Sequence, residues 1–503
     1  MSVPRWLWFV TALHAVAFAA FSSLNVLALK TNIDFAGAQQ GMWQLAFGPD
    51  QFNTVFGAHN FVNHFYGAHL TLAPLFRLWP SPHLLKWVQV FAVAGGAPVV
   101  FRLAWARTRN PALAGGLALL YLLHPVVINL SLGDYYGIFA VPLLLLLLLD
   151  QVERSPRCAL LLTLATLACQ ENLAPTVLLI GAYVALKHNR RLGVTMMLLA
   201  IGWLTFLLFW MIPHLNQGYS TPHLAVYAIY GETPAEILRT LCTRPAWVGE
   251  RMLIQHSGLS YLGQLIGTAG GACLLAPELL LLQAADFLIN FLPTYDGSQT
   301  FGRHYGVVGL AVSMFAAAEG LARAQRWLEC GIVADADGRT RALVLLLMAL
   351  ALPISLAHSG LRSVNPGEML RAAFAPQAVA LRRLLASLPP EAGVATEPNL
   401  LLHLARRPVA YALPNPWRRQ GWNGQADDPD YGKYIVSAEA TIDLTRGEDV
   451  DYVVVTSPGA RENPFDENYF TGALIKTGRY RLWRKTPQAV VLQRIVTPVP
   501  TTD

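Results

Sequence analysis

Apolar residues dominate the chain from residue 6 to about residue 358, in long runs that short polar connections separate. A helix needs about 20 apolar residues to cross the hydrocarbon core of a bilayer, and only structures that satisfy their own backbone hydrogen bonds are stable there. The pattern therefore predicts membrane-spanning helices. The predicted spans are 6–28, 84–106, 112–130, 137–149, 158–170, 173–186, 192–213, 262–276, 278–292, 304–322 and 342–358.

The distribution of Lys and Arg sets the predicted orientation, because short cytoplasmic loops carry an excess of these residues. A cytoplasmic N-terminus places the cations of alternate connections on the cytoplasmic side, and eleven crossings then put the C-terminus outside. These cations are Arg5, Arg107, Arg109, Arg154, Arg157, Lys187, Arg190, Arg191, Arg323, Arg326, Arg339 and Arg341.

The stretch 158–186 admits two interpretations, one long helix with Glu171 at mid-membrane or two short helices that turn there. A segment of about 13 residues rises only about 20 Å, which is short of the roughly 30 Å core. A single crossing, however, would place Lys187, Arg190 and Arg191 outside and contradict the charge distribution of the other loops. The charge distribution therefore favours two helices.

The sequence changes character after residue 360, where charged residues become frequent. Short apolar runs at 394–396 and 452–455 are bounded by turn residues and predict buried strands, while 480–493 predicts a terminal hairpin. The periodicity of 370–388 predicts a helix. These elements indicate a small α/β domain outside the membrane.

The composition agrees with this division. Hydrophobic residues make up 54% of the chain and charged residues only 14%, whereas soluble chains are about 25% charged. The net charge of +6 comes without a basic tract that has interleaved aromatics, so nucleic acid is not an expected partner. We expect a mainly α protein, with a polytopic transmembrane domain of about 11 helices at 1–360 and a small extracytoplasmic α/β domain at 361–503. The expected location is a membrane, with the N-terminus in the cytoplasm.

Polar groups that could do chemistry gather in the predicted outer connections, and such a gathering indicates a site. Asp34 follows the first span. A carboxylate at a low-dielectric rim suits the acceptance of a proton from an attacking hydroxyl, although it could equally cap the following helix. His59, His64 and His69 are spaced five apart, not at the i, i+4 spacing that places two imidazoles on one metal. The histidines therefore predict no metal site.

Asp134 and Glu171 fall at outer ends of predicted spans. With Asp34 they could form an acidic cluster, or each could simply be solvated at the rim. Arg303 and His304 precede another span on the same side. A guanidinium beside a helix N-terminus suits an anionic phosphate, and the alternative is an arginine that snorkels to the headgroups.

The order of short motifs along the chain resembles a family of bacterial multi-pass membrane proteins defined by domain of unknown function 2079, which is in turn similar to the C-type glycosyltransferase (GT-C) superfamily. The resemblance covers most of the chain. The motifs are Asn32-Ile33-Asp34-Phe35, Gln39, Trp43, His64-Phe65, Gln89, Asp134-Tyr135-Tyr136, Gln170-Glu171-Asn172, Arg303-His304-Tyr305, Asp451-Tyr452-Val453-Val454 and Gly478-Arg479-Tyr480.

This resemblance implies a GT-C-like glycosyltransferase of the bacterial inner membrane. It would move a sugar from a polyprenyl-phosphate carrier to an unidentified acceptor on the outer face of that membrane. In that superfamily an acidic residue of the first outer loop acts as base or metal ligand, which is Asp34 here. The implied catalytic residues are Asp34, Glu171 and Asp134. The implied substrate-binding residues are His64, Arg303, His304, Tyr305, Tyr136 and Gln39. No cofactor is assigned, and a divalent metal ion stays open as an alternative.

The chain departs from the family in two motifs. The family commonly has Asp-Phe-His where this chain has 134–136, and Lys-Glu-Asp where this chain has 170–172. The missing ionisable groups weaken a metal-dependent interpretation and leave two other classes open. One is a transporter or lipid flippase, which would place polar groups near the bilayer centre between pseudo-symmetric halves. The other is a non-catalytic scaffold descended from such enzymes.

Overall fold

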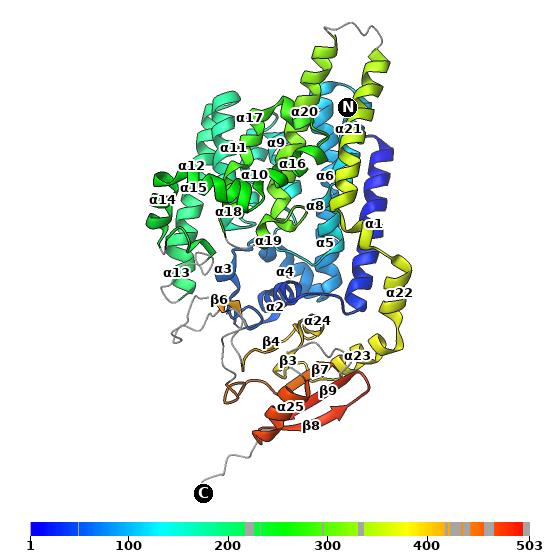
Figure 1. Cartoon of the computed structure of the whole chain (residues 1–503), viewed down its shortest axis with the longest axis vertical. Helices are drawn as coiled ribbons and strands as arrows, with labels where there is room; N and C mark the ends of the chain where they lie inside the picture. Colours follow the sequence, from blue (N-terminus) through cyan, green and yellow to red (C-terminus); the bar gives the residue numbers. More distant parts are fainter. Residues whose placement is uncertain are drawn as a thin grey trace. The chain divides into compact units, whose positions relative to one another are not determined.

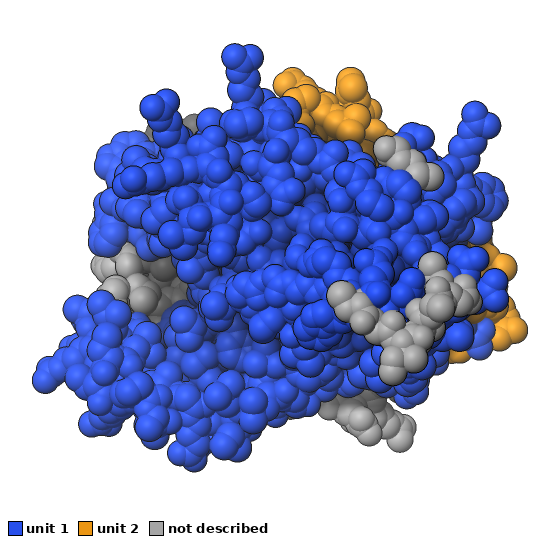
Figure 2. All heavy atoms as spheres, turned by 90° about the horizontal axis from the view of Figure 1, so that it is seen from above, with its two compact units in different colours: residues 1–22, 64–68, 85–365 blue, residues 23–63, 69–84, 366–503 orange. Residues whose placement is uncertain are grey.

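The computed structural model describes residues 2–48, 50–216, 226–231, 233–293, 296–329, 336–417, 421–422, 434–435, 443–456 and 467–495. The chain divides into two compact units, which Figure 2 colours separately. Unit 1 consists of Met1–Ser22, His64–Ala68 and Leu85–Asn365, and unit 2 consists of Ser23–Asn63, His69–Leu84 and Pro366–Asp503. Most of the predicted first outer loop thus folds with the C-terminal residues. The predicted division at about residue 360 concerns location in the membrane and stays a prediction.

Unit 1 is helical (Figure 1). Several of its helices begin with proline in the first turn, where the missing amide hydrogen leaves no acceptor unsatisfied. Its helices are α1 (Arg5–Leu27, shared with unit 2), α5 (Pro82–Ala94), α6 (Gly96–Thr108), α7 (Pro111–Leu122), α8 (Pro125–Leu132), α9 (Val141–Gln151), α10 (Pro156–Leu167), α11 (Ala174–Lys187), α12 (Arg190–Phe206), α13 (Ile212–Leu215), α14 (Pro234–Thr243), α15 (Pro245–Glu250), α16 (Gly258–Thr268), α17 (Pro277–Leu280), α18 (Ala284–Phe291), α19 (Asp296–Gln299), α20 (Val307–Glu329) and α21 (Ala336–His358).

Helix α20 is the central helix of unit 1 and contacts α6, α7, α9 and α17. Of the apolar window in His304–Glu329, 89% is buried. Small residues allow this close packing: a Cβ added at Gly320 would lie 1.9 Å from the carbonyl oxygen of Ala272. By contrast, only 17% of the window in α21 is buried, and its exposed residues include Leu345 and Leu346. An apolar face of this kind suits contact with lipid.

The predicted count of about 11 spanning helices is not confirmed. Among the described residues, five helices are long and apolar enough to cross a membrane, or six if α7 and α8, which are bent by 42°, form one span. Helices α10 and α11 have 12 and 14 residues, so at about 1.5 Å per residue they rise only about 18 and 21 Å. The predicted spans 262–276 and 278–292 are likewise broken into α16, α17, α18 and short 3₁₀ turns. The five single helices are Arg5–Leu27, Pro82–Thr108, Arg190–Leu215, His304–Glu329 and Asp337–His358.

The turn between α10 and α11 decides between the two interpretations of 158–186. Helix α10 ends at Leu167 and α11 begins at Ala174, so the structure has two short helices. Between them lies a single 3₁₀ turn, Glu171–Leu173. The Glu171 carboxylate therefore lies at a helix break and not in the middle of a long helix.

Unit 2 contains the predicted small C-terminal α/β part. Its five-stranded sheet has the order β4-β3-β7-β9-β8. The first three strands run parallel, with Val394 paired to both Ala410 and Tyr452, and the last two form an antiparallel hairpin. The strands are β3 (Val394–Thr396), β4 (Ala410–Ala412), β7 (Tyr452–Thr456), β8 (Tyr480–Lys485) and β9 (Ala489–Arg494); two short pairs, β1 (Phe52–Asn53) with β2 (Ala58–His59) and β5 (Gly421–Trp422) with β6 (Tyr434–Ile435), lie outside the sheet.

The predicted helix at 370–388 is interrupted. Pro376 cannot donate a backbone hydrogen bond and disfavours a helical conformation at the residue before it, so the segment forms α22 and α23. The helices of unit 2 are α2 (Ile33–Phe47), α3 (Asn60–Asn63), α4 (Ala68–Leu78), α22 (Pro366–Phe374), α23 (Pro376–Ala386), α24 (Pro398–Leu401) and α25 (Glu467–Lys476).

A buried glutamine joins the first-loop part of unit 2 to the sheet. The fully buried Gln40 side chain donates from Nε2 to Thr54 Oγ1 at 2.9 Å and lies 3.3 and 3.2 Å from the carbonyl oxygens of Arg407 and Pro408. Its Oε1 accepts from the Val55 amide at 3.0 Å. Buried polar groups are costly unless hydrogen-bonded, so these bonds hold α2 against the residues that enter β4.

Candidate functional site

The strongest polar contact among the predicted site residues joins His64 to Glu171. His64 Nδ1 lies 2.6 Å from Glu171 Oε1, and the Phe65 amide donates to Glu171 Oε2 at 2.9 Å. The two side chains are 24% and 14% exposed. Both carboxylate oxygens are thus engaged, and charge-assisted bonds of this length are among the strong ones. Glu171 therefore fixes the position of the imidazole.

Hydrogen-bond chemistry decides which nitrogen of His64 carries the proton in the contact with Glu171. The Gln170 amide lies 2.9 Å from the same Nδ1 atom, and one ring nitrogen cannot both donate and accept. The 2.6 Å contact with the carboxylate makes Nδ1 the donor, and the consistent orientation of Gln170 presents its oxygen to the ring. In the neutral ring, Nε2 of His64 then carries a lone pair and can accept a proton.

Aromatic groups lie beside this pair. Tyr136 stacks on His304 with 3.9 Å between ring centroids, and His304 contacts Tyr305 at 4.0 Å. His64 also contacts Tyr66, at 5.5 Å. The structure therefore brings Tyr136, His304 and Tyr305 together in one cluster of contacting rings.

Helix α5 anchors the segment that carries Tyr136. Gln89 accepts from the Tyr136 amide at 2.8 Å and donates to the carbonyl oxygens of Leu130 and Asp134 at 2.6 and 2.8 Å. The fully buried Lys86 donates to the same two oxygens at 2.6 and 3.2 Å. The Asp134 carboxylate interacts electrostatically with the Lys86 ammonium. The half-buried Asp134 thus interacts with the charge of the buried Lys86, two residues before Tyr136.

Sequence reasoning missed Lys86, although a signal was present. Lys86 lies within the predicted span 84–106, three residues before Gln89, so both side chains share one face of a helix. Ionisable residues within apolar spans are rare and commonly functional. The same signal marks Asp286 and Asn290, which are four residues apart in the predicted span 278–292.

Tyr227 and Asp286 extend the polar group around Glu171. The Tyr227 hydroxyl donates to the carbonyl oxygen of Ile289 at 3.0 Å. Burial, and then the charges of Glu171 and Asp286, raise the pKa of Tyr227 to about 12. The phenol therefore keeps its proton. The buried Asp286 accepts from Asn290 Nδ2 at 3.1 Å. The sequence places Tyr227 in a predicted outer loop, residues 214–261, but gives it no site role, because the loop has no periodic pattern.

Arg303 precedes α20 in a constrained loop. Gly302 has a φ of +84°, a left-handed conformation that favours glycine. The Arg303 side chain is exposed, and among the residues that the structure describes it forms no hydrogen bond or ion pair. An exposed guanidinium of this kind is available to an anion.

Asp34 and Gln39 belong to unit 2, whereas the other seven predicted site residues belong to unit 1. Asp34 is exposed in the first turn of α2, where a negative charge is favourable. The buried Gln39 donates to the carbonyl oxygen of Leu402 at 3.3 Å. This bond gives Gln39 a structural position, and the catalytic role of Asp34 stays a prediction. Over the described ranges, no three His, Cys, Asp or Glu side chains are grouped so that they could hold a metal ion.

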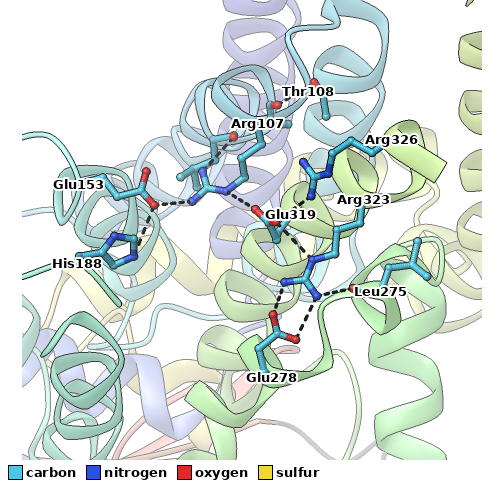
Figure 3. Close-up of polar contacts among 11 residues, drawn as sticks. Arg107, Thr108, Glu153, His188, Leu275, Glu278, Glu319, Arg323 and Arg326 are labelled. Carbon is cyan, nitrogen blue, oxygen red and sulfur yellow. Dashed lines mark hydrogen bonds and ion pairs between the residues drawn. The ribbon is translucent and has the colours of Figure 1, made fainter. Parts of the chain in front are cut away.

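A second polar cluster lies towards the C-terminal end of α20 (Figure 3). Arg107 contacts Glu153 at 3.1 Å and Glu319 at 3.4 Å, and Arg323 contacts Glu319 at 3.4 Å and Glu278 at 3.3 Å. Its members come from connections predicted to be cytoplasmic, or from spans next to them. This α20 C-terminal cluster consists of Arg107, Glu153, His188, Glu278, Glu319, Arg323 and Arg326.

Comparison with known proteins places most of the chain in one family. A model of the family described as "Predicted membrane protein (DUF2079)" matches residues 39–449. No curated protein matches the sequence. Among solved structures, the chain is similar to the crystal structure of ArnT from Cupriavidus metallidurans in the apo state, at 12% identity, over 95% of this chain and 97% of that chain, with a TM-score of 0.46. Such a distant likeness transfers no residue roles.

Proposed function

Because this chain belongs to the family described as "Predicted membrane protein (DUF2079)", we propose that its polar group in unit 1 is a membrane-associated glycosyl-transfer site. The proposed reaction moves a sugar from a polyprenyl-phosphate carrier to an acceptor hydroxyl at the outer face of the membrane. The observation that carries the proposal is the 2.6 Å contact of His64 with Glu171, beside the stacked Tyr136 and His304 rings.

The His64–Glu171 pair supplies the proton acceptor. Glu171 holds Nδ1 as a donor, so Nε2 can accept the proton of the acceptor hydroxyl as its oxygen attacks the anomeric carbon. The carboxylate then stabilises the imidazolium that forms, as in other His–carboxylate pairs. A new bond forms between the acceptor oxygen and the anomeric carbon, and the bond from that carbon to the phosphate oxygen breaks.

Arg303 supplies the anion site for the leaving phosphate. The electron pair of the broken bond moves to a phosphate oxygen, and a fixed cation lowers the cost of that charge. A lipid-linked donor fits this chemistry, because nucleotide sugars are charged and do not cross the bilayer. The stacked Tyr136, His304 and Tyr305 would contact the sugar, and Asp134 would act through Lys86.

Asp34 is the second candidate for the base, on the family resemblance alone. The proposed orientation has the N-terminus in the cytoplasm and the C-terminal part of unit 2 outside. Contacts within the α20 C-terminal cluster (Figure 3) support this orientation, because connections predicted on the cytoplasmic side meet there.

A deletion strain tests the proposal even though the transferred sugar is unidentified. Mass spectrometry of lipid-linked and envelope glycans should show loss of one glycan modification and accumulation of a polyprenyl-phosphate sugar. Wild-type protein should restore the profile, and Glu171→Gln should reduce restoration by at least about tenfold, since a positioned base contributes about 10²–10⁴-fold. Glu319→Gln makes the same change in the α20 C-terminal cluster and should restore the profile fully.

The results separate the two bases. If Asp34→Asn abolishes restoration while Glu171→Gln does not, the base is Asp34 and the His64 assignment is wrong. If the deletion leaves every glycan and polyprenyl-phosphate lipid unchanged, the glycosyl-transfer proposal itself is wrong.

One observation favours the transporter alternative. Glu171 and Asp286 lie at or near breaks between short helices, and discontinuous helices with polar groups are typical of transporter binding sites. The α20 C-terminal cluster argues against it, since its ion pairs join several helix connections that alternating access would separate. Movement of a labelled polyprenyl-phosphate lipid across proteoliposomes without product formation would favour a transporter, and neither activity would favour the scaffold.

A further inference from the structure

The loop that carries Arg303, residues 298–306, is held by two side-chain amides that the proposed reaction does not use. We propose that Asn129 and Asn290 are positioning residues, which hold this Arg303 loop as a preformed binding site for the phosphate of a polyprenyl-phosphate lipid. The inference rests on the proposed function, because that function gives Arg303 its anion. It adds the reason why the Arg303 backbone is fixed although its side chain has no hydrogen bond or ion pair among the described residues.

Asn129, on α8, holds the middle of the loop. Its Nδ2 donates to the carbonyl oxygen of Gly302 at 3.1 Å and to that of His358 at 3.2 Å. Its Oδ1 accepts from the Gly360 amide at 2.6 Å. One side chain thus ties the residue before Arg303 to the end of α21.

Asn290, on α18, holds both ends of the loop. Its Nδ2 donates to the carbonyl oxygen of Tyr305 at 3.2 Å and to Asp286 Oδ2 at 3.1 Å. Its backbone carbonyl accepts from Ser298 Oγ at 2.7 Å. Asn290 is 6% exposed and Asp286 is 7% exposed, so these bonds are shielded from water. A buried carboxylate next to the amide fixes which way the amide faces.

The loop leaves no room for a side chain at position 302, and its backbone conformation there favours glycine. Its φ is +84°, and a Cβ added there would lie 2.8 Å from Asn129 Nδ2 and 3.3 Å from the carbonyl oxygen of His358. The residue before Arg303 is therefore fixed by conformation, by hydrogen bonds and by packing together. The Arg303 side chain is exposed and, among the described residues, forms no hydrogen bond or ion pair.

This combination is what a preformed anion site requires. Binding an anion with a long side chain costs conformational entropy, and a fixed backbone removes the part of that cost that belongs to the loop. A purely structural role for the two amides would instead stabilise unit 1 without regard to any ligand. The two roles differ in whether the effect of Asn290 depends on Arg303, which a double-mutant cycle measures.

The test uses the full-length protein in lipid nanodiscs and two probes, undecaprenyl phosphate and undecaprenol, which differ only in the phosphate. Arg303→Gln should weaken undecaprenyl phosphate binding by at least about tenfold, since charge-assisted bonds to phosphate are the strong ones. Asn290→Ala should weaken it about fivefold in the wild-type background and by less than about twofold in the Arg303→Gln background. Undecaprenol binding should be unchanged in every variant.

Matched variants keep the test decisive. Asn110→Ala removes another side-chain amide of unit 1, which caps α7 and donates to Thr340 Oγ1 at 2.8 Å, and it should leave phosphate binding unchanged. If Asn290→Ala does not fold, Asn129→Asp replaces it in the cycle, because aspartate keeps the acceptor for Gly360 and loses the donor to Gly302.

The outcomes separate the two proposals. Equal binding by wild type and Arg303→Gln would overturn the anion site of the proposed function. A strong Arg303→Gln effect with independent, additive effects of Asn290→Ala would leave that function standing and overturn the positioning role. Weaker binding of undecaprenol by Asn290→Ala would also overturn it, because the amide would then be needed for the lipid chain or the fold and not for the phosphate.

Discussion

Replacing Gln40 by leucine should loosen unit 2 while leaving its volume nearly unchanged. The Gln40 side chain is fully buried and is the hydrogen-bond partner of the Val55 amide and of the carbonyl oxygens of Arg407 and Pro408. Leucine satisfies none of them. Thr54 Oγ1 keeps its bonds to Ala410, at 2.8 and 2.9 Å, so the loss falls on the three backbone groups.

The size of the effect follows from these groups. A buried donor or acceptor left unsatisfied costs about 1–3 kcal/mol, and the carbonyls lose less than the amide because each retains a second lone pair. Since neighbouring losses are not additive, we expect roughly 2–5 kcal/mol in total. The matched control is Gln377→Leu at an exposed position of α23, which should change the stability by less than about 0.5 kcal/mol.

Hydrogen exchange is the suitable measurement, because the two units need not unfold together. The amides of β3 and β7 report on the opening of unit 2, and a loss of roughly 2–5 kcal/mol speeds their exchange by roughly 30-fold to 5,000-fold. If exchange in Gln40→Leu stays within about threefold of that in Gln377→Leu, the buried amide does not hold the first-loop segment to the sheet, and the structural role assigned to Gln40 is wrong.

Three further changes have defined outcomes. Burial lowers the pKa of His69 to about 4 from 6.5, so between these two pH values only the unfolded chain binds the proton. The contribution of His69 to stability is therefore full above pH 6.5 and falls by about 3 kcal/mol towards pH 4. Thermal unfolding at pH 7.5 and 4.5 should show a smaller difference in unfolding temperature for His69→Gln than for wild type. Lys86→Met should lower the unfolding temperature, because it removes a positive charge that interacts with Asp134. The double variant Lys86→Met, Asp134→Asn should recover part of that loss. If the single and double variants lose equally, the interaction of Lys86 with Asp134 does not contribute to stability. Gly393→Ala should lower the opening free energy of β3, measured by hydrogen exchange, by at least about 2 kcal/mol, because a Cβ there would lie 1.8 Å from a carbonyl oxygen. A Cβ at Gly472, inside α25, would meet no atom within 4 Å. Gly472→Ala should therefore stabilise unit 2 by roughly 0.5–1 kcal/mol.

Local sequence signals predicted the small sheet well. The runs at 394–396 and 452–455 are β3 and β7, and the hairpin at 480–493 is β8 and β9. The first two are short apolar runs with turn residues on both sides, so their boundaries can be located from the sequence alone. Which loop folds against the sheet was not predictable in this way, because Gln40 and Arg407 are brought together by a contact between distant segments.

The number of spanning helices was less predictable for a physical reason. An apolar run shows that a segment avoids water, but it does not distinguish lipid from protein surroundings. Helix α9 has 11 residues, is apolar from Val141 to Leu149 and is largely buried in unit 1. It rises only about 17 Å at about 1.5 Å per residue. Single-sequence hydropathy counts such a half-length helix as a span.

In the candidate site, individual residues were predictable from the sequence, whereas most of the contacts between them were not. Glu171 and His64 were selected separately, and their contact depends on the turn between α10 and α11 that the charge distribution favoured. Asn129 was not selected, because an asparagine in an apolar run has no motif and its function lies in the backbone groups it reaches. Positioning residues of this kind become visible only when the loop that they hold is known.

The arginines near the two ends of α20 differ in whether they form ion pairs, and this difference indicates where an anionic substrate can bind. Towards its C-terminal end, the guanidinium groups of Arg107 and Arg323 contact glutamates of the same cluster (Figure 3), so an incoming anion would have to displace a carboxylate. Before its N-terminal end, Arg303 is exposed and, over the described ranges, without an ion pair. The Glu171 carboxylate, by contrast, already accepts a hydrogen bond from the His64 imidazole. A site that must bind a phosphate and accept a proton needs a cation without an ion pair, and a carboxylate that is hydrogen-bonded to the proton-accepting imidazole. Only the N-terminal side of α20 offers both among the described residues. Substitutions of Arg303 or Glu171 should therefore impair function at constant stability, and substitutions in the α20 C-terminal cluster should lower stability at constant function.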